Sequence, residues 1–183
     1  MVEMEKLQKQ GVLLRITATA LLILTLLLVR FNTQTKVLFL TLVKKATYRD
    51  LDPLFVLVWV DLAAAAYNVV HVLICFFFPI KEELGTIYRS LAWASYLVDQ
   101  GVVYLVFAAN SAATEASLLA VKGSNSFQWM KVCNRFTRFC YQVGGALFCG
   151  LLASIVLALV SSLSAYRLFR LYSTKQFLLL KKK

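Results

Sequence analysis

Residues 54–78 read LFVLVWVDLAAAAYNVVHVLICFFF, an apolar run that is interrupted by a single formal charge, Asp61. A helix needs about 20 apolar residues to cross the roughly 30 Å hydrocarbon core of a bilayer, and this run meets that length. Three further apolar runs occupy residues 12–31, 90–113 and 143–166. The sequence therefore predicts an all-α membrane protein, a four-transmembrane-helix bundle with up-down-up-down topology and short connections.

The composition supports one compact membrane unit over residues 1–183. Hydrophobic residues make up 60% of the chain and the mean hydropathy is +0.72, whereas soluble domains are about 45–50% apolar. Four spans leave only tails and loops, so any activity must lie between the helices or in those loops. The net charge of +11 comes from Lys and Arg spread over tails and loops. This placement is typical of helix ends that border anionic lipid, so we expect membrane lipids and not nucleic acid as partners.

The polar segments predict the topology. With four spans, both tails lie on one side, and the six basic residues after Tyr166 favour the cytoplasm. Asn32–Asp52 is then the first outer loop and Lys81–Glu83 lies in a short inner turn. We expect Phe127–Gln142 to form a short amphipathic lead-in before the fourth helix. The N-terminal apolar run lacks a small-residue cleavage site, so it is interpreted as a retained first span.

Two polar stripes are expected to face the bundle interior, because polar atoms that face lipid are costly. On the second span, the spacing of Asp61, Asn68 and His71 places them on one helical face. On the third span, Asp99 and Asn110 share a face in the same way.

The intramembrane acids need partners. An unpaired acid at this depth costs roughly 3 kcal/mol, and Arg15 lies in the same inner half of the bundle as Asp99. We therefore predict a structural pair of Arg15 with Asp99, and as a weaker second pair Arg30 with Asp61. For Asp61, a protonated acid or a hydrogen bond to a neighbouring helix remains open. A proton or ion pathway through Asp61, Asp99 and His71 is the alternative function.

The fourth span carries small residues that predict close helix packing. These helix-packing residues are Gly150, Ser154, Ala158 and Ser161.

The cysteines do not form a recognisable redox or metal motif. None are spaced as Cys-x-x-Cys, and one His with scattered Cys cannot build a closed zinc site, so no cofactor or metal is expected. On one continuous helix, Cys133 and Cys140 would lie about 10 Å apart, too far for a disulfide. Either the helix is broken near Asn134 and the two are bridged on the outer side, or both are free thiols. No nucleophile–base pair indicates catalysis.

Several blocks of the sequence together carry a family resemblance. They are Arg15, Ala46–Leu51 (ATYRDL), Tyr96–Gln100 (YLVDQ), Gln128–Phe136 (QWMKVCNRF) with Phe139–Cys140, and Ser164–Tyr172 (SAYRLFRLY). With these blocks the chain resembles the CASP-like (Casparian strip membrane domain protein-like) family of plants, which is related to MARVEL tetraspans. The last two blocks are most similar to its second subfamily.

The resemblance implies a non-enzymatic plasma-membrane scaffold with both termini in the cytoplasm. It also implies assembly with itself and with related CASP-like proteins, as homodimers and heterodimers, into platforms that position cell-wall-modifying machinery. Because the first outer loop lacks the longer aromatic–proline signature of relatives that build the Casparian strip, a generic CASP-like scaffold is expected. A vesicle-trafficking tetraspan is a further alternative.

Overall fold

The computed structural model describes residues 2–39, 42–77, 85–123, 133 and 136–181. Along the chain lie α1 (Val2–Arg30), β1 (Gln34–Phe39), β2 (Leu42–Ala46), the 3-10 helix η1 (Tyr48–Asp50), α2 (Asp52–Phe77), α3 (Gly85–Lys122) and α4 (Thr137–Lys181). Phe78 of the predicted second span and the predicted inner turn at Lys81–Glu83 fall outside the described residues.

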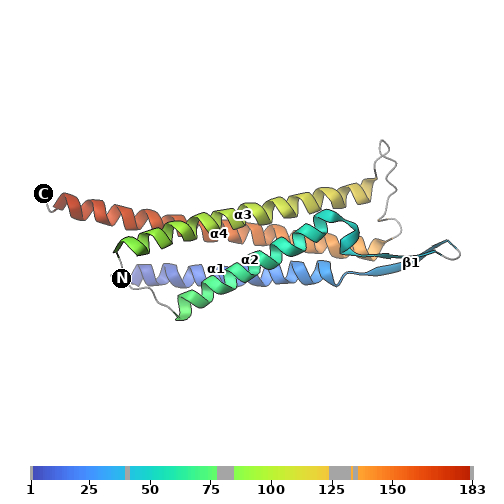
Figure 1. Cartoon of the computed structure of the whole chain (residues 1–183), viewed down its shortest axis with the longest axis horizontal. Helices are drawn as coiled ribbons and strands as arrows, with labels where there is room; N and C mark the ends of the chain where they lie inside the picture. Colours follow the sequence, from blue (N-terminus) through green and yellow to red (C-terminus); the bar gives the residue numbers. More distant parts are fainter. Residues whose placement is uncertain (1, 40–41, 78–84, 124–132, 134–135, 182–183) are drawn as a thin grey trace.

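The four helices run alternately up and down, and α1 begins at the end of the bundle where α4 finishes (Figure 1). Each helix packs against its neighbours in sequence, and α4 packs against α1, which closes the bundle. Among the described residues, four segments are long and apolar enough to cross a membrane: Lys9–Arg30, Asp52–Phe77, Ser90–Lys122 and Thr137–Arg170. The predicted four-helix membrane bundle is confirmed.

The helices are longer than the apolar runs that predicted them. α1 already begins at Val2, and α4 begins at Thr137, so the described end of the predicted lead-in is the first part of α4. α3 continues to Lys122 and ends where Gly123 adopts a φ of 70°. The N–H of Gly123 donates to the carbonyl of Leu119 at 2.8 Å, which is a typical glycine helix end.

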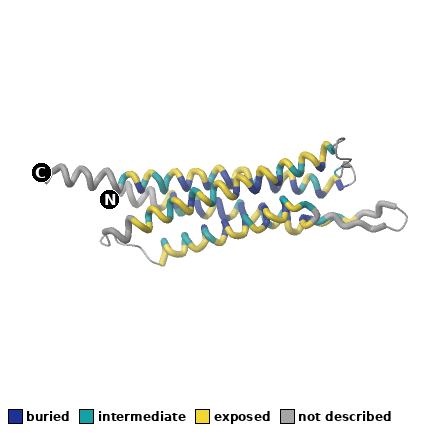
Figure 2. Tube along the Cα trace, turned by 45° about the horizontal axis from the view of Figure 1, so that its top comes forward, coloured by how far each residue is buried: buried dark blue, intermediate teal, exposed yellow. Residues whose placement is uncertain are grey.

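Buried residues lie along the sides of the helices that face one another, and the outward sides are largely exposed (Figure 2). One core cluster includes Leu54, Leu57 and Ala146, and the second includes Leu22 and Val106. Many large apolar side chains point outward as well. This pattern suits a bundle whose outer surface contacts hydrocarbon, where apolar exposure carries no penalty.

β1 and β2 form an antiparallel hairpin in what the sequence predicts as the first outer loop. It projects from one end of the bundle (Figure 1), which is called the hairpin end below. The side chain of Asn32, just before β1, donates to the carbonyl of Phe139 at 2.8 Å, and Oε1 of Gln34 accepts from the N–H of Phe139 at 3.1 Å. These bonds attach the end of α1 to the first turn of α4.

Candidate functional site: a polar network that joins the four helices

Arg15 is the centre of a polar network inside the bundle. Its side chain is buried although it carries a charge. Nη2 donates to Oδ2 of Asp99 at 2.5 Å, and Nη1 donates to Oδ1 of Asn68 at 3.1 Å. The guanidinium also lies over the ring of Tyr67, 5.8 Å from its centroid. One side chain of α1 therefore contacts both α2 and α3.

The carboxylate of Asp99 accepts three hydrogen bonds. Beside the bond from Arg15, Oδ1 accepts from the hydroxyl of Tyr67 at 2.8 Å and Oδ2 accepts from the hydroxyl of Ser164 at 2.7 Å. Ser164 belongs to α4, so all four helices supply a member of the network. Hydrogen bonds to a charged group are stronger than neutral ones, and together they offset the cost of burying this acid.

Two further contacts surround the Arg15–Asp99 pair. Nε2 of His71 lies 3.0 Å from the hydroxyl of Ser95, which joins α2 to α3. The hydroxyl of Ser161 donates to Oε1 of Gln100 at 2.6 Å, which joins α4 to α3. His71 and Ser161 thus each bond to a neighbouring helix rather than to a common channel.

A second polar contact lies nearer the hairpin end. Asn110 of α3 is fully buried, and its Nδ2 donates to the carbonyl of Leu147 at 3.3 Å. A Cβ added to Gly150 would lie 2.5 Å from Oδ1 of Asn110. Gly150 therefore lets α3 and α4 approach closely at this point.

We expect Gly150→Ala to lower the stability of the bundle by about 1 kcal/mol, because overpacking outweighs the gain in helix propensity. Gly145→Ala is the matched control, since a Cβ there meets nothing within 4 Å. Thermal unfolding of both variants in detergent measures the difference. An equal melting temperature for the two would contradict the close contact at Asn110.

The predicted helix-packing residues of α4 divide into two sets. Gly150, Ser154 and Ser161 are buried, whereas Ala158 is exposed and Leu157 is buried in its place. The prediction was wrong at Ala158, because steps of four residues drift off one face of a helix with 3.6 residues per turn.

The predicted pair of Arg30 with Asp61 is not formed. Nη1 of Arg30 donates to the hydroxyl of Tyr48 at 3.0 Å. Asp61 is fully buried between the two core clusters, and within the described part of the chain neither of its carboxyl oxygens has a hydrogen-bond partner. The alternative of a hydrogen bond to a neighbouring helix is therefore wrong as well. The prediction failed because Tyr48 lies nearer to the end of α1 and offers Arg30 an acceptor.

Two arginine side chains contact the hydroxyl of Tyr48 at the hairpin end. Nε of Arg49 lies 3.4 Å from its hydroxyl, and Arg30 contacts the same oxygen. The hydrogen bond with Arg49, together with the positive charge of Arg30, lowers the pKa of Tyr48 below its usual value of 10.

Cys133 and Cys140 form a disulfide, with their Cα atoms 5.8 Å apart. Cys133 precedes α4, so the two residues are not on one continuous helix and the distance argument against a bridge does not apply. Asn134, where a break was expected, lies outside the described residues. The N–H of Cys133 also donates to the carbonyl of Ala120, which places the bridge against α3.

The site is suited to holding helices together rather than to chemistry. The described residues contain no cluster of three or more His, Cys, Asp or Glu that could hold a metal ion. The carboxylate of Asp99, the most polar group of the site, is occupied by three donors from three helices. The arrangement connects one side chain from each of the four helices, and fixing register is the best-attested use of a buried polar group.

The sequence analysis missed Tyr67 and Ser164. Ser164 follows Ser161 by three residues and Tyr67 directly precedes Asn68, so both positions could have been placed beside the predicted stripes. Hydroxyl groups are common on membrane helices, however, and their spacing does not reveal which of them reaches a partner.

Comparisons with known proteins identify the family of this chain. The Casparian strip membrane protein domain matches residues 4–156. CASP-like protein 2C1 of Vitis vinifera is 55% identical over 92% of this chain and 82% of its own length, and that of Populus trichocarpa is 47% identical over 96% and 97%. CASP-like protein 2C1 of Arabidopsis thaliana is 40% identical over 95% of this chain and 96% of its own length. No solved structure matches the chain. With four membrane-spanning helices and these relatives, the chain belongs to the CASP-like family of Casparian strip membrane proteins.

Proposed function

We propose that this protein is a non-enzymatic scaffold of the plant plasma membrane. It associates with itself and with related CASP-like proteins as homo- and hetero-oligomers, and the platform so formed positions cell-wall-modifying machinery. The observation that carries the proposal is the network around Arg15 and Asp99. Its two charged groups bond each other and neutral side chains of the other two helices, which suits a rigid building block better than a site that must accept a substrate.

The outer face of α3 supports association through its helices. Ala94, Gly101 and Ala108 recur every seven residues and are all exposed. A Cβ added to Gly101 meets nothing within 4 Å, so the backbone is open here to a second helix. Small residues allow the close approach by which membrane helices gain packing energy.

The charge distribution and the disulfide support an orientation with both termini in the cytoplasm. Six basic residues follow Tyr166 in the sequence, α4 ends opposite the hairpin (Figure 1), and basic flanks favour the cytoplasmic side. The disulfide between Cys133 and Cys140 lies near the hairpin end, and such bonds persist in oxidising compartments outside the cytosol.

The alternative of a small ion or proton transporter is not favoured. A relay requires titratable groups within hydrogen-bond range of one another. Among the described hydrogen bonds, those of Asp99 lead to Arg15, Tyr67 and Ser164, those of His71 lead to Ser95 and Cys75, and none reaches Asp61.

We expect differently tagged copies to co-purify in mild detergent, and a fluorescent copy to recover slowly after bleaching in plant plasma membrane. Gly101→Leu should lower the co-purified fraction several-fold, because the larger side chain separates the helices. Gly145→Leu is the control, since it adds the same side chain at another open position.

Two results would contradict the scaffold. One is recovery as fast as that of a monomeric four-span protein, with only monomers in mild detergent. The other is a flux in reconstituted vesicles that Asp61→Asn or Asp99→Asn abolishes without changing assembly.

A further inference from the structure

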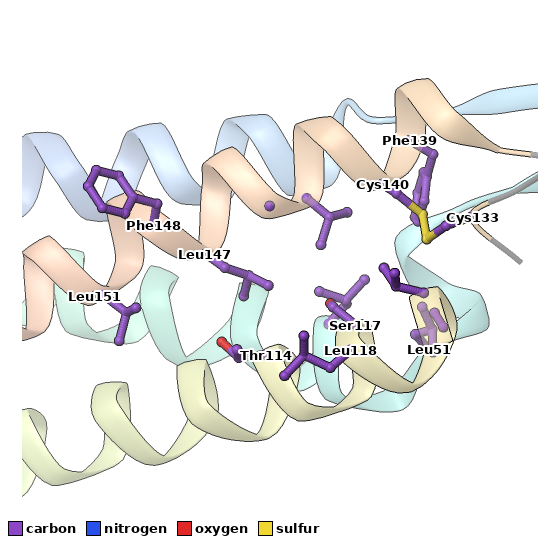
Figure 3. Close-up of a pocket in the computed structure, with 15 residues that line it drawn as sticks. Leu51, Thr114, Ser117, Leu118, Cys133, Phe139, Cys140, Leu147, Phe148 and Leu151 are labelled. Atoms are coloured by element: carbon purple, nitrogen blue, oxygen red, sulfur yellow. A yellow bond between two sulfur atoms is a disulfide. The ribbon is translucent and has the colours of Figure 1, made fainter. Parts of the chain in front are cut away.

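A groove of about 290 Å³ lies at the hairpin end, between the second half of α3 and the first half of α4, with the start of α2 closing one side (Figure 3). We call it the α3–α4 groove. Its walls include Leu118, Val121, Val143, Leu147 and Leu151. These residues belong to the segments Ser90–Lys122 and Thr137–Arg170, so the groove lies in the part of the bundle that faces the bilayer.

The walls offer almost no polar contact. The two hydroxyl groups in the lining belong to Thr114 and Ser117, and each donates at 2.7 Å to a carbonyl of its own helix, at Asn110 and Ala113. A ligand would therefore meet methyl, methylene and ring surfaces. Such a groove favours hydrocarbon over water or a polar solute.

Two basic residues lie next in sequence to residues that line the groove, at the ends of α3 and α4 nearest the hairpin. Lys122 follows the lining residue Val121 and ends α3, and Arg138 precedes the lining residue Phe139 in the first turn of α4. Both side chains are exposed. Basic residues at the ends of membrane helices lie at headgroup depth, where they attract phosphate.

We propose that the α3–α4 groove binds a glycerophospholipid, with one acyl chain along the apolar walls and the phosphate against Lys122 and Arg138. The apolar lining, the position within the spans and the basic end suit the two parts of this ligand.

The disulfide forms the wall of the groove at its basic end. Cys133 and Cys140 both line the groove (Figure 3), and the bridge holds the segment before α4 against α3. The disulfide thus forms part of the groove wall at the hairpin end, and a chain inside the groove extends from there toward the centre of the bilayer.

Gly144 allows a sharp test. It lines the groove, and a Cβ added there meets nothing within 4 Å. Gly144→Leu should place hydrocarbon in the groove, starting from a Cβ position that is open. Gly145→Leu adds the same side chain one residue away, outside the groove lining, where a Cβ also meets nothing within 4 Å. Equal melting temperatures and helical content of the two variants establish that both are folded.

The experiment uses the full chain in phosphatidylcholine nanodiscs that contain phosphatidylcholine with a photoreactive acyl chain. We expect labelling to concentrate on residues 114–121 and 143–151, and Gly144→Leu to lower it about tenfold, which corresponds to about 1.4 kcal/mol of binding. Gly145→Leu should label as the wild type does. A matching diacylglycerol probe, which lacks phosphate, should label less than phosphatidylcholine, and Lys122→Gln with Arg138→Gln should abolish that difference.

Labelling of Gly144→Leu at the wild-type level, or labelling spread evenly over all exposed helix faces, would overturn the proposal. So would a loss of cross-linked dimer in Gly144→Leu with unchanged lipid labelling, because the groove would then hold a second copy. The scaffold function is tested separately by Gly101→Leu on the outer face of α3, so either conclusion can fail without the other.

Discussion

Arg15→Ala is expected to destabilise the protein by about 3–5 kcal/mol, the usual effect of removing one partner of a buried ion pair. The substitution leaves the carboxylate of Asp99 inside the bundle with only the hydroxyl donors of Tyr67 and Ser164. It also removes the donor to Oδ1 of Asn68. Thermal unfolding in detergent and the amount of protein at the cell surface measure the loss.

A double substitution tests whether the loss comes from the charge that is left unpaired. Arg15→Leu with Asp99→Leu removes both charges and should recover much of the stability that either single change loses, because no unpaired charge remains. Glu115→Ala, an exposed position on α3, is the surface control. If Arg15→Ala unfolds at the same temperature as the wild type, the pair does not stabilise the bundle.

A milder variant covers the case in which Arg15→Ala does not fold. Tyr67→Phe keeps the ring beneath the guanidinium and removes only the hydroxyl that donates to Oδ1 of Asp99. Because hydrogen bonds to charged groups are worth about 1.5–3 kcal/mol, we expect a loss within that range.

The four helices could be predicted because each apolar run exceeds the thickness of the hydrocarbon core. The contact of Arg15 with Asp99 could be predicted from depth alone, since both residues lie in the inner half of the bundle and an unpaired acid there is costly. Depth also suggested Arg30 as the partner of Asp61, yet Arg30 bonds to Tyr48 instead. Matching depth identifies candidates but does not reveal on which side of a helix they lie.

Features that depend on the connections were harder to predict. The β1–β2 hairpin lies in a segment that contains Thr, Val, Leu and Phe, residues found in strands, but the order of the four spans predicts only that this segment is an outer loop. The disulfide depends on where α4 begins. A helix that started earlier would hold Cys133 and Cys140 about 10 Å apart, and the mixed polar and apolar residues around them do not distinguish the two cases.

Asp61→Val is expected to raise the stability of the protein by about 2 kcal/mol, opposite in sign to the change at Arg15. The Asp61 side chain is fully buried, and both carboxyl oxygens lack a hydrogen-bond partner among the described residues. A polar group left unsatisfied inside a protein costs about 1–3 kcal/mol. Valine has a comparable width and adds apolar contacts with the two core clusters that flank this position.

Thermal unfolding in detergent and in nanodiscs of plant lipid tests this prediction, with Asp61→Asn as the matched control. Asparagine keeps the shape and the polarity, so it should gain less than valine does. A lower melting temperature for Asp61→Val in both media would show that the carboxyl group is satisfied in the folded protein.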